Sequence, residues 1–210
     1  MTPIQACDEE QVRTLFVQSY QHLFKAYPSV QKMTKTALKK DLAVNILLNL
    51  SQEITRSSTP TRTTRSSIGQ YYHEQNGIFL VAVVSSSHPK DDHDSPPSPK
   101  VIGSIGVRKC DTSTEKGLRQ TIPGATYEIH RLFVHPDYQS QGIAHQLLDM
   151  ALNELNIVVG DAFVLATTLV LLEGAIRFYE RQGFEVMEET DIVPNLQLRT
   201  YGKTVQSRSS

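Results

Sequence analysis

The stretch from Glu128 to Leu148 reads EIHRLFVHPDYQSQGIAHQLL, and its pattern changes from that of a strand to that of a helix. The segment 127–134 is rich in aromatic and aliphatic residues, which favour strands. Pro136 favours a turn directly after it. From Gly142 to Leu155 the apolar residues recur at helical spacing, and this face consists of Ile143, Leu147, Leu148, Ala151, Leu152 and Leu155. The stretch therefore predicts a strand, a short turn and an amphipathic helix.

The junction between this strand and this helix is suited to bind a phosphate group. Backbone N–H groups in the first turn of a helix have no partner within the helix, and the helix dipole makes this end positive. Gly142 lets an anion approach the backbone without a Cβ in the way, and Ala144 is the next smallest residue. Taken alone, the motif Gln139-x-x-Gly142-x-Ala144 fits an ordinary connection containing a glycine better than an anion site.

Patterns elsewhere in the chain predict an α+β fold. We expect a short strand over 2–7, followed by a helix that begins at Asp8 and is ended by Pro28. Gln11 stands at capping-box spacing from Asp8. The strand 78–84 is expected to be buried on nearly both faces and to pair as a hairpin with a strand over 101–109. Further expected elements are helices over 36–54 and 173–182, strands over 162–167, 184–187 and 196–201, and polar connections over 55–67, 85–100 and 111–125.

The composition argues against several classes of protein. The length of 210 residues fits one domain better than two, and the net charge of −1 argues against a nucleic-acid binder. We expect Cys7 and Cys110 to be thiols of a reducing compartment rather than a disulfide. The histidines and aspartates of the 85–100 insertion have nothing to order them as ligands, so no metal site is expected.

No targeting or membrane segment is expected. The N-terminus lacks both the basic start and the apolar core of a signal peptide. The most apolar tract, 155–172, is interrupted by Gly160 and Asp161 and is interpreted as a helix end, a turn and a buried strand, not as a membrane span. We therefore expect an intracellular, cytoplasmic protein.

A second block of sequence supports a functional interpretation of the first. Residues 175–184 read AIRFYERQGF, with Tyr179 placed 37 positions after Gly142. Together with 128–148, this block resembles the GNAT superfamily of acyl-CoA-dependent N-acetyltransferases. The resemblance covers residues 77–187 and implies a mixed, mostly antiparallel central sheet of about seven strands flanked by about four helices. It also implies one acetyltransferase domain over 1–204, with its cofactor-binding core at 77–187. The proline- and serine-rich composition of 85–100 indicates a mobile insertion in this domain, and residues 205–210 are expected to be a tail.

The resemblance implies acetyl-CoA as co-substrate and no metal. In the family, backbone amides of the turn before the helix hold the CoA pyrophosphate; here that role falls on Gln139, Ser140, Gln141, Gly142, Ile143 and Ala144. The central strand of the family diverges from its neighbour and pairs with the pantetheine arm, a role that falls on Leu132, Phe133 and Val134. A backbone N–H of the same strand would face the thioester oxygen.

Three residues are candidates for proton transfer. Tyr179 matches the family tyrosine that protonates the departing thiolate as general acid, and its alternative is a core tyrosine on an apolar helix. Some family members place a catalytic glutamate at the position of Glu128, which makes it our choice of general base. His130 shares its strand face, so that one of the two is the base and the other a substrate contact. The alternative for Glu128 is a structural ion pair.

One position departs from the family pattern. Many relatives carry an asparagine three residues before the alanine of Ala-x-x-x-Tyr, where it caps the helix and touches the cofactor. Leu172 stands there in this chain. Thr167 or Thr168 could supply the polar contact instead.

These observations predict an N-acetyltransferase that transfers the acetyl group of acetyl-CoA to a primary amine by direct attack in a ternary complex. The expected acceptor is a small molecule or an amino-acid-like compound. The alternatives are a protein N-terminal or lysine acetyltransferase, and a non-catalytic acyl-CoA-binding or interaction domain on the same fold. We expect no nucleic-acid or membrane partner. The last strand of this fold often takes part in dimers, which leaves a homodimer open.

Overall fold

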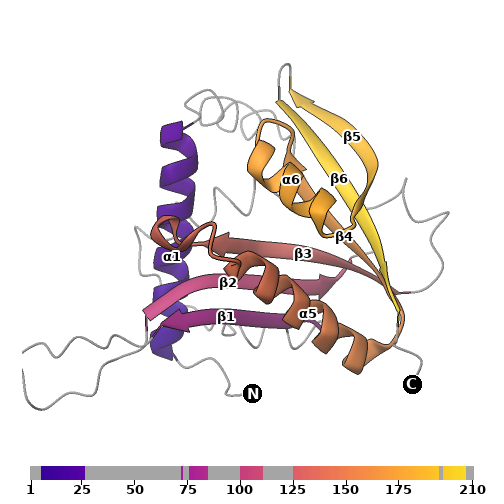
Figure 1. The fold of residues 1–210 in the computed structure, drawn as a ribbon, viewed down its shortest axis with the longest axis horizontal. Coiled ribbons are helices and arrows are strands. Elements are labelled where there is room, and N and C mark those ends of the chain that lie inside the picture. Colours follow the sequence, from indigo (N-terminus) through magenta and orange to yellow (C-terminus); the bar gives the residue numbers. More distant parts are fainter. Residues whose placement is uncertain are drawn as a thin grey trace, which may run out of the picture.

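The computed structural model describes residues 6–26, 72, 76–84, 100–110, 125–193 and 196–206. In this part of the chain six strands form one sheet, in the order β1-β2-β3-β4-β6-β5, with three α-helices packed on it (Figure 1). All neighbouring strands are antiparallel except β3 and β4, which are parallel. The elements are α1 (Ala6–Ala26), β1 (Ile78–Val84), β2 (Lys100–Lys109), β3 (Ala125–Val134), the 3-10 helix η2 (Pro136–Tyr138), α5 (Ile143–Val159), β4 (Ala162–Leu169), α6 (Glu173–Arg181), β5 (Glu185–Val193) and β6 (Leu196–Val205).

The predicted mixed, mostly antiparallel sheet is confirmed, and the described residues contain slightly fewer strands and helices than the whole chain was expected to have. Six predicted strands and the helices of 142–155 and 173–182 are present, most of them longer than the sequence pattern indicates. The predicted helix over 36–54 and the connection over 55–67 lie outside the described residues, as do nearly all of the 85–100 and 111–125 connections. In the described part of the chain, no helix is long and apolar enough to cross a membrane.

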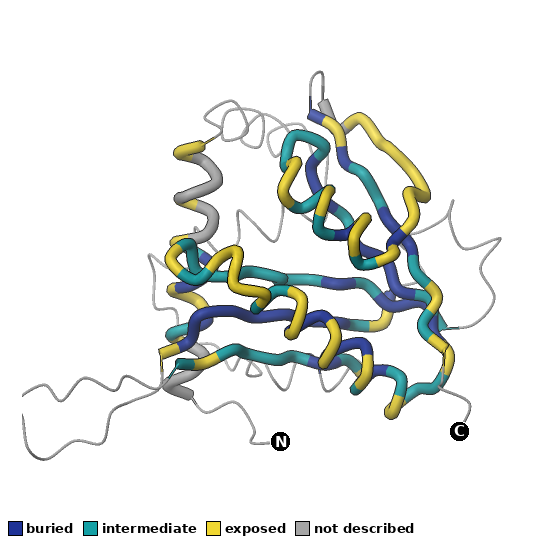
Figure 2. Tube along the Cα trace, in the orientation of Figure 1, coloured by how far each residue is buried: buried dark blue, intermediate teal, exposed yellow. Residues whose placement is uncertain are grey.

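Helices cover both faces of the sheet. α5 and α6 lie on one face, where Leu148 and Tyr179 belong to the same core cluster. α1 lies on the other face, where Leu15 and Phe16 pack with Val101 of β2. Figure 2 shows β2 buried along most of its length, as expected for a strand covered on both sides. We call these two sides the α5 face and the α1 face.

Strands β3 and β4 separate halfway along their length. They pair only from Ala125–Ala162 to Ile129–Ala166. Beyond this point β3 remains paired with β2 as far as Val134, and β4 remains paired with β6 as far as Leu169. Figure 1 shows the two strands diverging there. We call this region the β3–β4 fork; its arms are residues 130–134 of β3 and 167–169 of β4.

A β-bulge lies on the β3 arm of the fork. Between the cross-strand pairs Gly106–His130 and Ser104–Phe133, β3 contains one residue more than β2. Arg131, within this bulge, has a φ of 56°, in the left-handed region. The fully buried Ser104 donates its hydroxyl hydrogen to the Arg131 carbonyl over 2.9 Å. A core side chain of β2 thus fixes the kink that redirects β3 beside the fork.

Two expectations about the first half of the chain are wrong. Ala6 and Cys7 belong to α1 and not to the predicted strand over 2–7, whose other residues lie outside the described part of the chain, and alanine is the strongest helix former. Asp8 consequently lies inside the helix and not at its N-cap. The amide oxygen of Gln11 accepts a hydrogen bond from the Val101 N–H over 2.8 Å, which ties α1 to β2.

The burial expected for β1 is also wrong. Only Ile78 is fully buried, and Val83 is half exposed. The reason is topological, since β1 is an edge strand of the sheet. Its predicted hairpin pairing with β2 is confirmed.

Replacing Gly106 by alanine is expected to destabilise the fold by about 1–3 kcal/mol, the usual cost of overpacking a core. A Cβ on Gly106 would overlap two ring atoms and the hydroxyl oxygen of the buried Tyr72. Urea unfolding measures the effect. Gly174→Ala is the matched control, because a Cβ on Gly174 would meet no described atom within 4 Å. Gly174 lies in helix α6, where alanine is more favourable than glycine by about 1 kcal/mol, so this variant should not be destabilised. Equal stability of Gly106→Ala and the native protein would contradict the packing.

Candidate active site

The turn between β3 and α5 is held by its own side chains. His135 precedes η2 and accepts a hydrogen bond from the Asp137 N–H at Nδ1. The side-chain amide of Gln139 donates to the Val134 carbonyl over 3.0 Å, and that of Gln141 donates to the Asp137 carbonyl over 3.2 Å. These bonds connect the end of β3 to the residues that lead into α5.

The start of α5 presents uncapped backbone N–H groups. Gly142 is the N-cap residue, with a φ of 80°, and no described side chain caps the helix there. Ser140 also has a left-handed φ, of 61°. Alternation of left-handed and other residues before a helix makes a concave set of N–H groups that suits an anion. A Cβ on Gly142 would meet no atom of the described residues within 4 Å, so an anion has room to approach the backbone here.

Glu128, His130 and Arg108 are in contact. Nε2 of His130 lies 3.0 Å from Oε2 of Glu128 and 2.8 Å from Nε of Arg108. Burial tends to raise the pKa of Glu128, but the hydrogen bond and the charge that a protonated His130 offers it, together with the charge of Arg108, outweigh burial. The pKa therefore lies below its ordinary value. Glu128 is thus a carboxylate at neutral pH.

Tyr179 of α6 has its ring in the core. The ring packs against Phe178, Phe184 and Tyr201, with centroids 5.3–5.7 Å apart. Among the described residues, no group forms a hydrogen bond with its hydroxyl. Burial, and after it the negative charge of Glu128, raises the pKa of this phenol far above its ordinary value. Tyr179 therefore keeps its proton at every physiological pH.

The carboxylate and the phenol belong to opposite faces of the sheet. Tyr127 and Ile129 join the core on the α5 face, so Glu128 and His130 point to the α1 face. Tyr179 belongs to the core on the α5 face. The charge of Glu128 nevertheless acts on the Tyr179 phenol. Because Ile129 is the last residue of β3 paired with β4, both groups lie where the fork opens.

Comparison with known proteins identifies the family of this chain. A family model described as an acetyltransferase (GNAT) domain matches residues 76–186, just over half of the chain. The chain belongs to the GNAT family. It is accordingly an acyltransferase of the EC 2.3.1 type that transfers an acetyl group from acetyl-CoA.

Solved structures agree with this assignment at the level of the fold. A GNAT-family acetyltransferase from Staphylococcus aureus Mu50 is 15% identical, with 98% of each chain covered and a TM-score of 0.53. A GNAT-family protein from Desulfovibrio desulfuricans is also 15% identical, with 96% of this chain and 95% of that chain covered and a TM-score of 0.52. None of the curated proteins matches the sequence.

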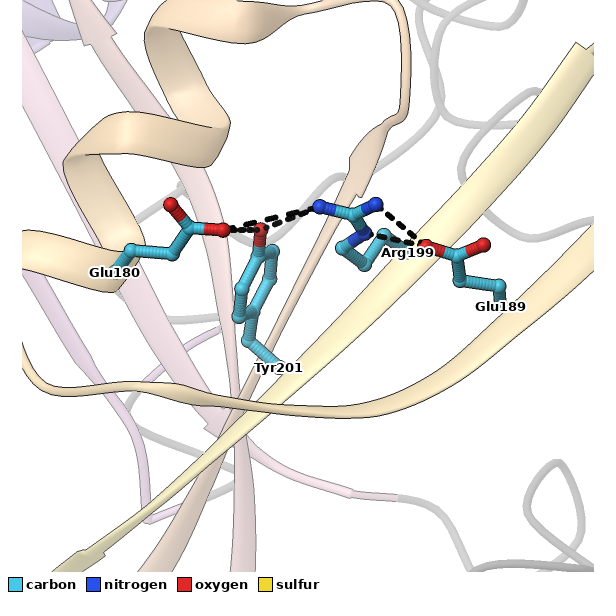
Figure 3. Close-up of polar contacts among 4 residues, drawn as sticks. All are labelled: Glu180, Glu189, Arg199 and Tyr201. Atoms are coloured by element: carbon cyan, nitrogen blue, oxygen red, sulfur yellow. Dashed lines mark hydrogen bonds and ion pairs between the residues drawn. The ribbon is translucent and has the colours of Figure 1, made fainter.

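The helix that carries Tyr179 is attached to β5 and β6 by a polar network (Figure 3). The Tyr201 hydroxyl donates to Glu180 over 3.4 Å, and Arg199 lies 3.8 Å from the same carboxylate. Nε of Arg199 donates to Glu189 of β5 over 2.6 Å. Hydrogen bonds to Tyr201 and to Glu189 raise the pKa of Arg199. The network holds α6 in register with the hairpin behind it.

The start of α6 shows where Leu172, the residue at the expected asparagine position, lies in the structure. Leu172 is the N-cap residue of α6, and its side chain makes no capping hydrogen bond. The predicted start of this helix at residue 173 is confirmed. The hydroxyl of Thr167 lies 3.3 Å from that of Thr200 on β6, so it makes a strand-to-strand contact, while Thr168 is buried.

The other two histidines of this region are structural. His135 belongs to the turn, as described above. His145 contacts Gln182 at the end of α6 over 2.8 Å and Asp149 on its own helix over 3.2 Å, and its side chain is about half exposed.

Sequence reasoning missed Arg108 and Tyr72. Arg108 is the cross-strand partner of Glu128, a relation that only the register of β2 and β3 defines. The buried Tyr72 covers Gly106, the cross-strand partner of His130. The only sequence signal for this contact is the glycine in the middle of a strand, which often marks the close approach of another group.

Proposed function

We propose that this GNAT protein acetylates the primary amine of a small-molecule or amino-acid-like acceptor by direct attack on acetyl-CoA in a ternary complex. The observation that carries the proposal is the pairing of Glu128 with His130 on one face of the fork and, on the other, the Tyr179 phenol, which has no hydrogen-bond partner among the described residues. Such an arrangement can take a proton from one reactant and give a proton to the other. The proposal treats residues 1–204 as one acetyltransferase domain.

The acetyl-CoA phosphates would bind at the start of α5. The uncapped N–H groups around Gly142 and the left-handed residues of 139–144 support this assignment. Beyond Ile129, β3 diverges from β4, and residues 132–134 are the segment to which an extended pantetheine arm could add by backbone hydrogen bonds. The acetyl group would then reach the fork from the α5 face.

The amine would approach from the α1 face. An aliphatic ammonium has a pKa near 10 and must lose a proton before it can attack. The Glu128–His130 pair would accept this proton and pass it to solvent. The neutral nitrogen attacks the thioester carbon, so that a C–N bond forms and the C–S bond breaks.

The departing thiolate would take its proton from Tyr179. The tyrosinate left behind recovers a proton from the attacking nitrogen, which keeps the count of protons balanced. A buried hydroxyl without a hydrogen-bond partner is unusual, and a sulfur atom in the fork would supply that partner. This step requires Tyr179 to be protonated, as its raised pKa ensures.

Thermal unfolding in the presence of acetyl-CoA tests the first part of this proposal. Acetyl-CoA at one hundred times its Kd should add about 2.7 kcal/mol to the free energy of unfolding, and adenosine alone should add far less. Thiol release with a panel of amines then identifies the acceptor. Release with peptides but not with small amines would transfer the proposal to a protein acceptor. No stabilisation at millimolar acetyl-CoA would overturn it in favour of an interaction domain.

Replacing Glu128 by glutamine is expected to lower kcat about 100-fold, the lower end of the usual contribution of a general base. Glutamine preserves the shape of the side chain but cannot take up the proton. The Kd for acetyl-CoA should remain unchanged, because the residue lies on the α1 face. Glu185→Gln, at an exposed site on β5, is the control for loss of one carboxylate. Normal turnover in Glu128→Gln would leave His130 or water as the base.

A further inference from the structure

Arg108 and Glu128 both contact the same ring nitrogen of His130. Nε of Arg108 lies 2.8 Å from Nε2 of His130, and Oε2 of Glu128 lies 3.0 Å from it. Arg108 and Glu128 are direct cross-strand partners, and His130 is two residues farther along β3 on the same face. The Nε2 atom therefore lies between a guanidinium and a carboxylate.

These two neighbours make opposite demands on Nε2. A guanidinium stays protonated and only donates hydrogen bonds, whereas an ionised carboxylate only accepts them. An unprotonated Nε2 can accept from Arg108, and a protonated Nε2 can donate to Glu128. One nitrogen does only one of these at a time, so each contact fits one protonation state of His130.

We propose that Arg108 is a positioning residue that holds Nε2 of His130 as a proton acceptor in the resting enzyme, and that Glu128 becomes the partner of Nε2 once the proton arrives. This inference rests on the proposed function. The proton comes from the acceptor ammonium, whose N–H bond breaks and whose electron pair stays on the amine nitrogen. It reaches Nε2 through the adjacent Glu128 carboxylate, and Arg108 keeps its charge throughout.

Other ionisable groups surround this pair, and the experiment has to separate them from Arg108. The first is Arg131 beside His130, with its guanidinium 4.9 Å from the ring of Phe16 on α1. The others are Tyr72, over Gly106 opposite His130, and Tyr179 on α6. Arg108 donates a hydrogen bond to the ring nitrogen itself. Its removal should therefore change which nitrogen carries the proton.

The protonation state of the ring can be read without turnover. Long-range proton–nitrogen NMR spectra of protein containing ¹⁵N-histidine distinguish a protonated from an unprotonated ring nitrogen, and His130→Asn identifies the signals of His130. We expect the neutral ring to carry its proton at Nδ1, and to lose this preference in Arg108→Met. A neutral wild-type ring protonated at Nε2 would overturn the inference. Because the spectra need no acceptor, they decide this point even where the proposed function fails.

The pH dependence of kcat/KM supplies the functional readout. Arg108→Met removes a cation beside the Glu128–His130 pair, so the pair should gain its proton more easily. The acidic limb of the profile should move to higher pH by about one unit, the lower end for loss of a neighbouring arginine. Arg108→Lys keeps the charge and should move the limb less. Arg177→Met, at an exposed site on α6, should not move it. An unmoved limb in Arg108→Met would contradict the inference.

Discussion

Replacing Gly142 by glutamate is expected to abolish acetyl-CoA binding while the protein stays folded. The φ of 80° at this residue costs any L side chain about 1–2 kcal/mol, which a domain of this size tolerates. No atom of the described residues lies within 4 Å of a Cβ placed there, so the fold leaves room for the new side chain. It adds a carboxylate where the uncapped N–H groups would hold the phosphates. The stabilisation by acetyl-CoA should fall from about 2.7 kcal/mol to none under the same conditions.

Gly160→Glu is a matched control for this variant. Gly160 follows the opposite end of α5 and has a φ of 74°, and a Cβ placed on it would also meet no described atom within 4 Å. Both variants therefore add the same charge to the same helix. The backbone strain is larger at Gly160, because its ψ of −141° combined with a positive φ lies in a region that few residues other than glycine adopt. Gly160→Glu should lose at least as much stability and keep the full response to acetyl-CoA. A full response in Gly142→Glu would show that the turn before α5 is only a turn.

The local parts of this site were predictable from the sequence. Gly142 and the apolar face of α5 are one continuous stretch, and Tyr179 lies on a short helix that ends with Gly183 at a φ of 73°. Each of these features depends on neighbours within one or two helical turns. Patterns of this range determine helix ends and amphipathic faces, and the structure has them where the sequence indicated.

The features that the sequence analysis missed or predicted wrongly depend on residues far apart in the sequence. Arg108 is placed opposite Glu128 only by the register of the two strands. The kink at Arg131 depends on the Ser104 hydroxyl of β2, and no glycine in the sequence marks its left-handed φ. The exposure of β1 follows from its place at the sheet edge. Hydrophobic periodicity carries no information on which strand pairs with which, so composition alone could not reveal these relations.

The candidate proton-transfer groups lie on opposite faces of the fork, which the sequence could not show. Alternation along β3 separates Glu128 and His130 from the α5 face. Tyr179 belongs to a helix that packs on that opposite face. In the proposed mechanism, a mixed sheet that opens between two parallel strands would let the two reactants meet without sharing an entrance. The two proposed proton-transfer groups would then be separable by mutation.

Tyr179→Phe is expected to lower kcat by about 100-fold or more, within the usual range for loss of a general acid. The ring and its contacts with Phe184 and Tyr201 are preserved, and only the hydroxyl is removed. Among the described residues that hydroxyl has no hydrogen-bond partner, so its loss should leave the free energy of unfolding unchanged or slightly higher. The Kd for acetyl-CoA should also stay the same. Thiol release under saturating acetyl-CoA measures the effect on kcat.

Tyr201→Phe makes the same chemical change in the same aromatic cluster. Its hydroxyl donates to Glu180 and lies 3.4 Å from Arg199, so its removal should cost about 1 kcal/mol of stability. It should leave kcat near the native value, because this phenol serves the network behind α6 and not the thioester. The two variants therefore predict opposite outcomes, loss of turnover without loss of stability and loss of stability without loss of turnover. Full activity in Tyr179→Phe would reduce this tyrosine to a core residue.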